Sequence, residues 1–224
     1  MREQRSIETL REKVYNHLKK LIKARRLKSG EFMDLNMIGQ ELGMSRTPLR
    51  DALFQLESEG FITIFPRRGV MLNSLDLKMV RDIYEIIGAL ESSALLSVAG
   101  KLSANDIKKM KQLDDEIQVC LDKDNYEALY KCNVAFHNVF LNKSKNDELI
   151  RTARIQRERL YDFPEWRTLL TDWEQSNLYE HIEIVRLLEE GDFTGAADYL
   201  RDVHWSYSVQ EKFIRTYYLT RKSD

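Results

Sequence analysis

Three histidines in the second half of this chain have the residue type and spacing to bind a metal ion. His137, His181 and His204 fall on three different predicted helices, and Asn133 lies four residues before His137, on the same helical face. The helices carrying His181 and His204 should be antiparallel about Gly191-Asp192, which places the two rings at similar height. A helical bundle can therefore gather three imidazoles and an amide oxygen. Spacing alone leaves open the alternative that each is an ordinary hydrogen-bonded histidine.

Arginines at the start of a short predicted helix are suited to a different chemistry, the reading of DNA bases. Ser45 is a good N-cap, and Pro48 then falls in the first helical turn, where its missing N–H costs nothing. Arg46 and Arg50 are four residues apart and share a face. An arginine can donate two hydrogen bonds to guanine, and the small Thr47 permits close approach. The pattern favours a DNA-reading helix over one that merely closes a core.

A predicted β-hairpin with a basic tip follows this helix. Residues 61–65 are rich in β-forming side chains, residues 66–69 read Pro-Arg-Arg-Gly, and residues 70–72 can return as the second strand. Arginines at such a tip can contact phosphates or enter the minor groove. The predicted DNA contacts are Ser45, Arg46, Thr47, Arg50, Arg67, Arg68 and Gly69.

Two further helices are needed to position the DNA-reading helix. Apolar residues at helical spacing predict one helix over about residues 7–26 and a second, shorter helix that Gly43 stops. Three helices and a hairpin make a winged helix-turn-helix, which we assign to residues 1–75. The polar stretch Asn73-Ser74-Leu75-Asp76 marks the expected domain boundary.

The remaining residues, 76–224, are predicted to be helical throughout. We expect helices over about 80–99, 103–122, 126–142 and 147–161, a fifth opened by Pro164, and a sixth from Gly191-Asp192 to Tyr218. Short connections between these segments predict an antiparallel bundle of about six or seven helices. The whole chain is therefore expected to be mainly α, with the predicted metal ligands inside the bundle.

Composition narrows the class of protein. The chain has 224 residues, of which 43% are hydrophobic and 32% charged, which suits two small soluble domains. Residues 1–75 hold 14 Lys and Arg against 9 Asp and Glu, whereas the remainder holds 21 against 27. A basic head on an acidic body fits a DNA-binding module. We find no apolar run that would span a membrane and no signal peptide, so we expect a cytoplasmic protein.

Taken together, these motifs resemble those of GntR-family transcription regulators of the FadR subgroup, which carry an FCD-type effector domain. The resemblance covers nearly the whole chain. It rests on Leu42 to Leu53, Leu56 to Phe61 and Pro66 to Val70 in the first domain, and on Asn133 to His137, Glu180-His181, Glu190 to Asp192 and His204 in the second. It implies a homodimer that binds a palindromic operator, usually as a repressor, and that senses a small organic acid.

The resemblance also implies a divalent metal bound by an aspartate and three histidines. His137, His181 and His204 match those positions, but Asn133 stands where the family has the aspartate. Asn can ligate through its carbonyl oxygen but brings no charge, so we expect weaker metal binding and stronger attraction of a carboxylate ligand. Imidazole ligands favour transition metals, Zn or Ni first among them. Ile87 stands where many relatives have an arginine, so a ligand-facing cation is expected to be missing.

Two alternatives remain open at the level of sequence. Three histidines around an open coordination position can activate water, as in a zinc-dependent hydrolase. The chain has no His-Glu-x-x-His segment, however, and no evident nucleophile with a base. The second alternative is a DNA-binding protein whose metal is purely structural.

Overall fold

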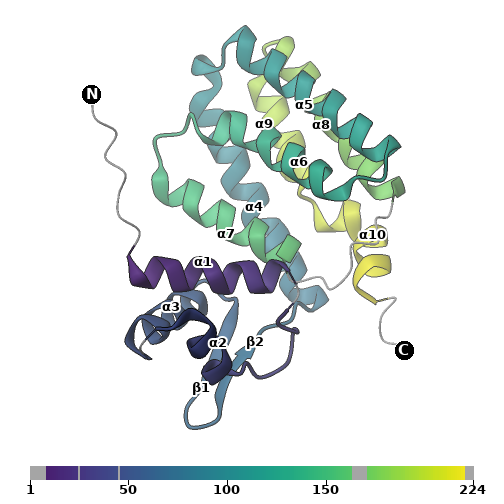
Figure 1. Ribbon diagram of the computed structural model, residues 1–224. Coiled ribbons are helices and arrows are strands. Elements are labelled where there is room, and N and C mark those ends of the chain that lie inside the picture. Colours follow the sequence, from purple (N-terminus) through teal and green to yellow (C-terminus); the bar gives the residue numbers. More distant parts are fainter. Residues whose placement is uncertain (1–8, 25, 45, 163–170, 220–224) are drawn as a thin grey trace, which may run out of the picture. The chain divides into compact units, whose positions relative to one another are not determined.

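The computed structural model describes residues 9–24, 26–44, 46–162 and 171–219 (Figure 1). Within these ranges the chain forms two compact units: residues 9–75 with residues 159–162, and residues 76–158 with residues 171–219. As the sequence predicts, the described part of the chain is mainly α-helical, with one two-stranded antiparallel sheet.

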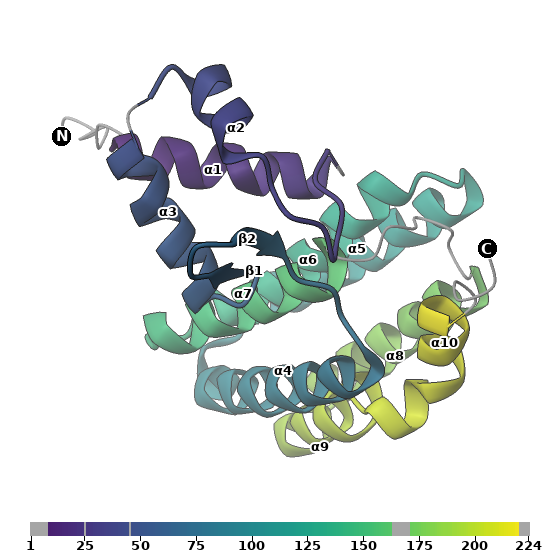
Figure 2. The ribbon, with the colours of Figure 1, turned by 90° about the horizontal axis from the view of Figure 1, so that it is seen from below.

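The first unit begins with two capped helices (Figure 2). α1 (Leu10–Lys23) starts at Thr9, which forms a reciprocal capping box with Glu12. α2 (Leu35–Leu42) is capped by Asp34 and ends at Gly43, whose φ of 58° is left-handed and favours glycine. α1 is therefore shorter at its C-terminal end than predicted, and its predicted start at residue 7 lies outside the described residues.

α3 (Arg46–Ser58) packs one face against α1. Leu49, Ala52, Leu53 and Leu56 are buried on that face, at the spacing that the sequence indicates. Arg46, Thr47 and Arg50 lie on the exposed side. Ser45, the predicted N-cap, lies outside the described residues.

The hairpin joins β1 (Ile62–Phe65) to β2 (Gly69–Leu72), with Ile62 paired to Leu72 and Phe65 paired to Gly69. The first strand starts one residue later than predicted and the second one residue earlier. Arg67 has a φ of 62° and Gly69 a φ of 119°, so the tight tip requires two residues in positive-φ conformations. This geometry presents Arg67 and Arg68 at the end of the wing.

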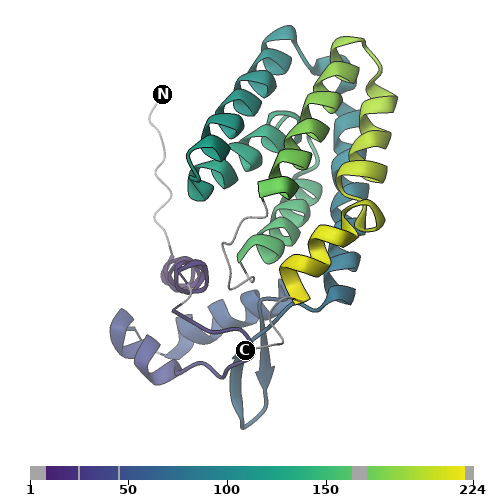
Figure 3. The ribbon, with the colours of Figure 1, turned by 90° about the vertical axis from the view of Figure 1, so that its right-hand side faces the viewer.

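The second unit is a bundle of helices (Figure 3). α5 packs against α6 and α8, and α4 packs against α6 and α9. Ser103 caps α5 through a capping box, as the sequence predicts. The bounds are α4 (Leu77–Val98), α5 (Ala104–Asp122), α6 (Tyr126–Leu141), α7 (Asp147–Asp162), α8 (Thr171–Glu189), α9 (Phe193–Tyr199) and α10 (Tyr207–Leu219). Pro164, predicted to open the fifth helix of the bundle, lies outside the described residues.

The prediction of one continuous final helix is wrong. A π-helical turn, Leu200–His204, separates α9 from α10, and the Trp205 N–H donates to the Leu200 carbonyl at 3.0 Å across five residues. Such a wide turn changes which side chains face the core, and it is frequent at functional sites. Here it buries both His204 and Trp205. Single-sequence periodicity cannot anticipate one extra residue in a turn.

The expectation that no segment could span a membrane is also corrected. By length and composition, Leu77–Lys101 is apolar enough to cross one. Half of its most apolar window is buried inside the protein. Its buried residues include Ile83, Ile87, Leu95 and the charged Glu91.

Close packing of α4 on the π-helical turn gives a test of this fold. A Cβ added at Gly88 would lie 3.1 Å from Trp205 Cβ and 3.4 Å from the Arg201 carbonyl oxygen. We therefore expect Gly88→Val to destabilise the second unit by about 1–3 kcal/mol through overpacking. Gly100→Val is the control, because no atom lies within 4 Å of its added Cβ.

Chemical denaturation followed by tryptophan fluorescence measures this effect, since the three tryptophans all follow Asp76 in the sequence. Equal midpoints for the two variants would contradict the close approach of α4 to the π-helical turn.

Candidate metal centre and DNA-reading surface

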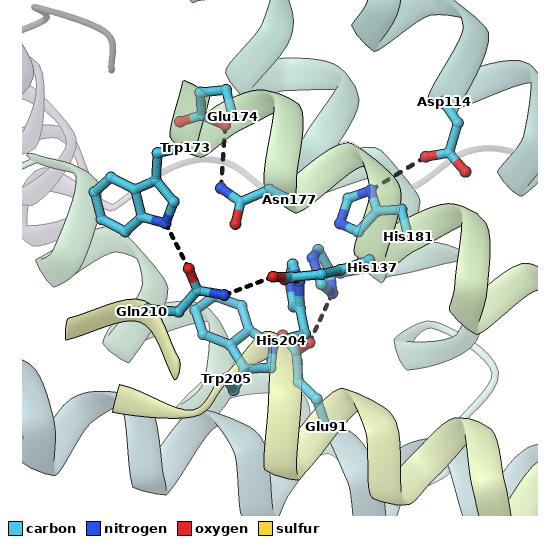
Figure 4. A network of polar contacts seen from close by, with 11 residues as sticks. Glu91, Asp114, His137, Trp173, Glu174, Asn177, His181, His204, Trp205 and Gln210 are labelled. Carbon is cyan, nitrogen blue, oxygen red and sulfur yellow. Dashed lines mark hydrogen bonds and ion pairs between the residues drawn. The ribbon is translucent and has the colours of Figure 1, made fainter. Parts of the chain in front are cut away.

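The structure brings the three predicted histidines together inside the bundle (Figure 4). His137 comes from α6, His181 from α8 and His204 from the π-helical turn. One ring nitrogen from each lies within 4.8 Å of the other two, a spacing that can hold a metal ion. All three side chains are buried, with exposed fractions of 0%, 1% and 5%. Residues widely separated in sequence thus form one compact cluster.

A carboxylate approaches the Nδ1 atom of each imidazole. The N···O distances are 2.7 Å from His137 to Glu91, 3.1 Å from His181 to Asp114 and 2.8 Å from His204 to Glu180. The His181 and His204 contacts are hydrogen bonds, and His137 and Glu91 form a close polar contact. Metal-binding histidines almost always have such a partner on the second ring nitrogen, which fixes the ring and its tautomer.

This arrangement leaves the Nε2 atoms as the candidate metal ligands. Nε2 of His137 and Nε2 of His181 are buried and have no hydrogen-bond partner among the described residues. A buried polar atom without a partner is unfavourable unless something else binds it. Burial also lowers the pKa of His137 and of His181, so both rings are neutral at pH 7 and can offer a lone pair. The residues present therefore fit a bound metal ion.

Glu91 is held as a buried, ionised carboxylate. Burial by itself would raise the pKa of Glu91, but the facing His137 ring, the Arg157 guanidinium and the Trp205 indole N–H lower it to about 2. Arg157 Nε lies 3.5 Å from Glu91, and the Trp205 indole N–H donates to Glu91 at 3.0 Å. The charge of Glu91 is thus balanced by Arg157, a cation from α7.

The other two carboxyl groups differ from Glu91 and from each other. Burial raises the pKa of Asp114 to about 8, and the neighbouring Asp115 acts in the same direction. Glu180 accepts hydrogen bonds from the Gln210 side chain at 2.7 Å and from His204. Among the described residues, no lysine or arginine forms an ion pair with Glu180.

The acidic residues behind the imidazoles were not part of the sequence-based prediction. Glu91 and Asp114 were missed as partners, although a glutamate on the apolar face of α4 was a usable signal. Glu180 was recognised only as a neighbour of His181. A hydrogen-bonded chain continues outward, because Gln210 in turn accepts from the Trp173 indole N–H at 2.9 Å.

Asn133 lies one helical turn before His137 on α6 and is 6% exposed. Its side chain makes no hydrogen bond to any described residue. The amide is thus buried on the same helical face as His137, as predicted, and free to bind another group.

The predicted DNA-contact residues occupy two exposed stretches of the first unit. Arg46, Thr47 and Arg50 lie in the first turns of α3, and Arg67, Arg68 and Gly69 at the wing tip are likewise exposed. The Arg68 guanidinium lies 5.9 Å from the centre of the Phe32 ring and 5.6 Å from that of Phe65. These aromatic contacts orient Arg68, a feature that the sequence pattern did not reveal.

Comparison with known families assigns both units. Residues 10–72 match the family described as bacterial regulatory proteins, gntR family, and residues 82–203 match the FCD domain. The chain belongs to the GntR family and carries an FCD domain. It is a DNA-binding transcription regulator, and the matching families and relatives are transcription regulators rather than enzymes.

Two relatives illustrate the extent of the similarity. The chain is 30% identical over 163 residues to the Nta operon transcriptional regulator of Aminobacter aminovorans. The aligned residues make up 72% of this chain and 75% of that relative. The chain is also 25% identical over 175 residues to the regulator McbR of Escherichia coli, and the aligned residues make up 78% of each protein.

Two solved structures share the fold. Escherichia coli McbR/YncC superposes with a TM-score of 0.71 at 20% sequence identity, covering 96% of this chain and 99% of that one. A putative GntR regulator from Rhodococcus sp. RHA1 superposes with a TM-score of 0.65 at 17% identity, covering 85% of this chain and 91% of that one. At these identities the likeness concerns the fold alone.

The carboxylate behind His204 gives a direct test of the metal centre. Glu180→Gln removes the negative charge that holds the His204 ring, so we expect Zn²⁺ affinity to fall by about 10- to 100-fold. Glu183→Gln is the control, since Glu183 lies on the same helix but pairs with Arg186 near the surface. Competition with a chromophoric chelator measures both affinities. Equal affinities in the two variants would contradict a supporting role for Glu180.

Proposed function

We propose that this protein is a cytoplasmic, homodimeric transcription repressor that releases its operator when a small carboxylate binds at a metal in the FCD unit. One observation carries the sensing part of the proposal. Three buried imidazoles converge so that one ring nitrogen of each lies within 4.8 Å of the other two, and each ring has an acidic side chain at its Nδ1 atom. Surface or purely structural histidines have no need of such an arrangement.

In this proposal the first unit reads DNA through α3 and the wing. Arg46 and Arg50 contact base edges in the major groove, because both are exposed at the N-terminal end of α3. Thr47 and Ser45 bind phosphates, although Ser45 lies outside the described residues. Arg67 and the adjacent wing-tip residue Gly69 contact the DNA backbone or the minor groove. Arg68 makes the same kind of contact from its position against the Phe32 and Phe65 rings. Two-fold symmetric proteins read two-fold symmetric sites, so a homodimer would bind a palindromic operator.

The proposed ligands of the metal are His137, His181, His204 and Asn133. Three imidazole nitrogens favour a transition metal such as Zn²⁺ or Ni²⁺ over Mg²⁺ or Ca²⁺. A bound ion of this kind would supply positive charge and open coordination positions for a carboxylate. Glu91, Asp114 and Glu180 hold the rings in the ligating orientation. Because Asn133 is uncharged, it leaves more of the metal's charge to attract the effector.

Effector and operator must then be coupled through the conformation of the dimer. A ligand that favours one arrangement of the bundle weakens operator binding, and by linkage the operator weakens ligand binding by the same factor. Residues of α4, α5, α6, α8 and the π-helical turn form the cluster and its acidic partners, so a change at the metal would reach five elements at once.

The DNA-reading role of α3 predicts a base-specific effect. We expect Arg50→Ala to weaken operator binding by about 1–3 kcal/mol and to relax the preference at one base pair. Lys28→Ala is the control, because Lys28 is an exposed cation of the same unit outside α3 and the wing. Fluorescence anisotropy with operator variants at several salt concentrations measures both. Wild-type affinity and selectivity in Arg50→Ala would show that α3 is misassigned.

The sensing role predicts that operator release requires both metal and acid. Thermal shifts and operator binding are measured with a panel of hydroxy, keto and amino acids (lactate, pyruvate, malate, citrate, glycine and aspartate), with and without prior removal of metal. We expect at least one acid to stabilise the metal-loaded protein and to release operator, and neither effect after His137→Ala. Stabilisation by metal alone, with no response to any acid, would instead identify a structural ion. Metal-dependent hydrolytic turnover that His137→Ala abolishes would identify an enzyme.

A further inference from the structure

The interior face of α8 carries a stripe of polar residues that leads away from His181. Glu174, Asn177 and His181 are spaced by three and four residues and therefore share one helical face. Figure 4 shows Glu174 and Asn177 on the side of the histidine cluster where Trp173 lies. Buried or half-buried polar side chains on a bundle-facing stripe need partners. The assigned metal centre uses His181 but neither of the other two.

Glu174 is a half-buried carboxylate without a paired cation among the residues that the structure describes. Its hydrogen-bond partner among the described residues is the Asn177 amide nitrogen, which donates to one carboxylate oxygen at 3.3 Å. Burial raises the pKa of Glu174, against the opposing effects of Asn177 and of the nearby His204. No described lysine or arginine forms an ion pair with it. Glu91 is different, because Arg157 balances its charge.

The hydrogen-bonding capacity of this stripe defines what would complement it. The carboxylate of Glu174 can only accept hydrogen bonds, and it has unused acceptor capacity. Asn177 uses its amide nitrogen on Glu174, which leaves the amide oxygen as a second acceptor. A hydroxyl could occupy one acceptor but would leave a desolvated negative charge unbalanced. An ammonium group brings three donors and the missing positive charge.

We propose that the effector of this regulator is a small amino acid, whose ammonium group binds Glu174 and Asn177 while its carboxylate binds at the histidine cluster. This inference rests on the proposed function, since it takes the carboxylate-binding role of the cluster as given. It adds the chemical class of the ligand. Glu174 is then the residue that selects an amine over a hydroxyl, and the ligand lies along the α8 stripe between Glu174 and His181.

Matched pairs of ligands test this selectivity in the full-length, Zn²⁺-loaded protein. Each pair differs only by an amine in place of a hydroxyl: glycine and glycolate, β-alanine and 3-hydroxypropionate, γ-aminobutyrate and 4-hydroxybutyrate, aspartate and malate. The graded chain lengths cover different separations between the two ends of the site. Isothermal titration calorimetry gives each affinity. We expect the amine to bind about tenfold or more tightly than the hydroxyl in at least one pair, as a desolvated charge pair requires.

Variants of Glu174 assign the preference to this residue. Glu174→Gln keeps the size and removes the charge, so the amine preference should fall to about threefold or less. Asp172→Asn is the matched control, since Asp172 is an exposed acid in the same first turn of α8, and it should keep the preference. Glu174→Asp, which retains a carboxylate, is the substitute variant if Glu174→Gln does not fold. We expect it to keep a reduced preference for the amine over the hydroxyl.

The possible failures are distinguishable. If hydroxy acids bind as well as their amino counterparts, or if the amine preference survives in Glu174→Gln, the amino-acid inference is wrong while carboxylate sensing stands. If no member of any pair binds the Zn²⁺-loaded protein, the proposed sensing function and the inference fail together.

Discussion

The second unit depends on the contact of each buried imidazole with a carboxylate. Histidine rings and carboxylates are costly to bury unless each finds a partner, and three of each lie close together in this core. Each ring has two nitrogens, and the contact of Nδ1 with Glu91, Asp114 or Glu180 gives one of them a polar partner. The Nε2 atoms of His137 and His181, which have no hydrogen-bond partner among the described residues, give the bundle its capacity to hold an ion. An ion bound at that point would offset part of the cost of the polar core.

The packing of the surrounding elements supports these imidazole–carboxylate contacts. Glu91 sits on the long apolar helix α4 and is stabilised by Arg157 and by the Trp205 indole. Trp205 reaches Glu91 because the π-helical turn between α9 and α10 buries it together with His204. The close approach at Gly88 allows that turn to pack on α4. In the proposed mechanism, a ligand at the cluster would therefore act on elements whose packing leaves little free space.

Much of this organisation can be predicted from the sequence. Local interactions determine the helix cap at Ser103, the helix end at Gly43 and the apolar spacing of α3. Features of this kind can be predicted from a single sequence. The convergence of His137, His181 and His204 was only one of two open interpretations, since it depends on how distant helices pack. The π-helical turn was missed because a one-residue insertion leaves no periodic signal. The roles of Glu91 and Asp114 were missed because a buried carboxylate is identified by its partner, and that partner is remote in sequence. The DNA contacts of the wing stay predictions, with the aromatic support of Arg68 added by the structure.

The central claim is that Nε2 atoms of three histidines bind one metal ion inside the FCD unit. X-ray absorption spectroscopy of the Zn²⁺-loaded protein at the zinc edge tests it most directly. The account predicts one ion per chain with three imidazole nitrogens at about 2.0–2.1 Å, completed by oxygen ligands. It also predicts loss of one imidazole from the shell in His204→Ala. A shell without imidazole, or one unchanged in that variant, would contradict the account.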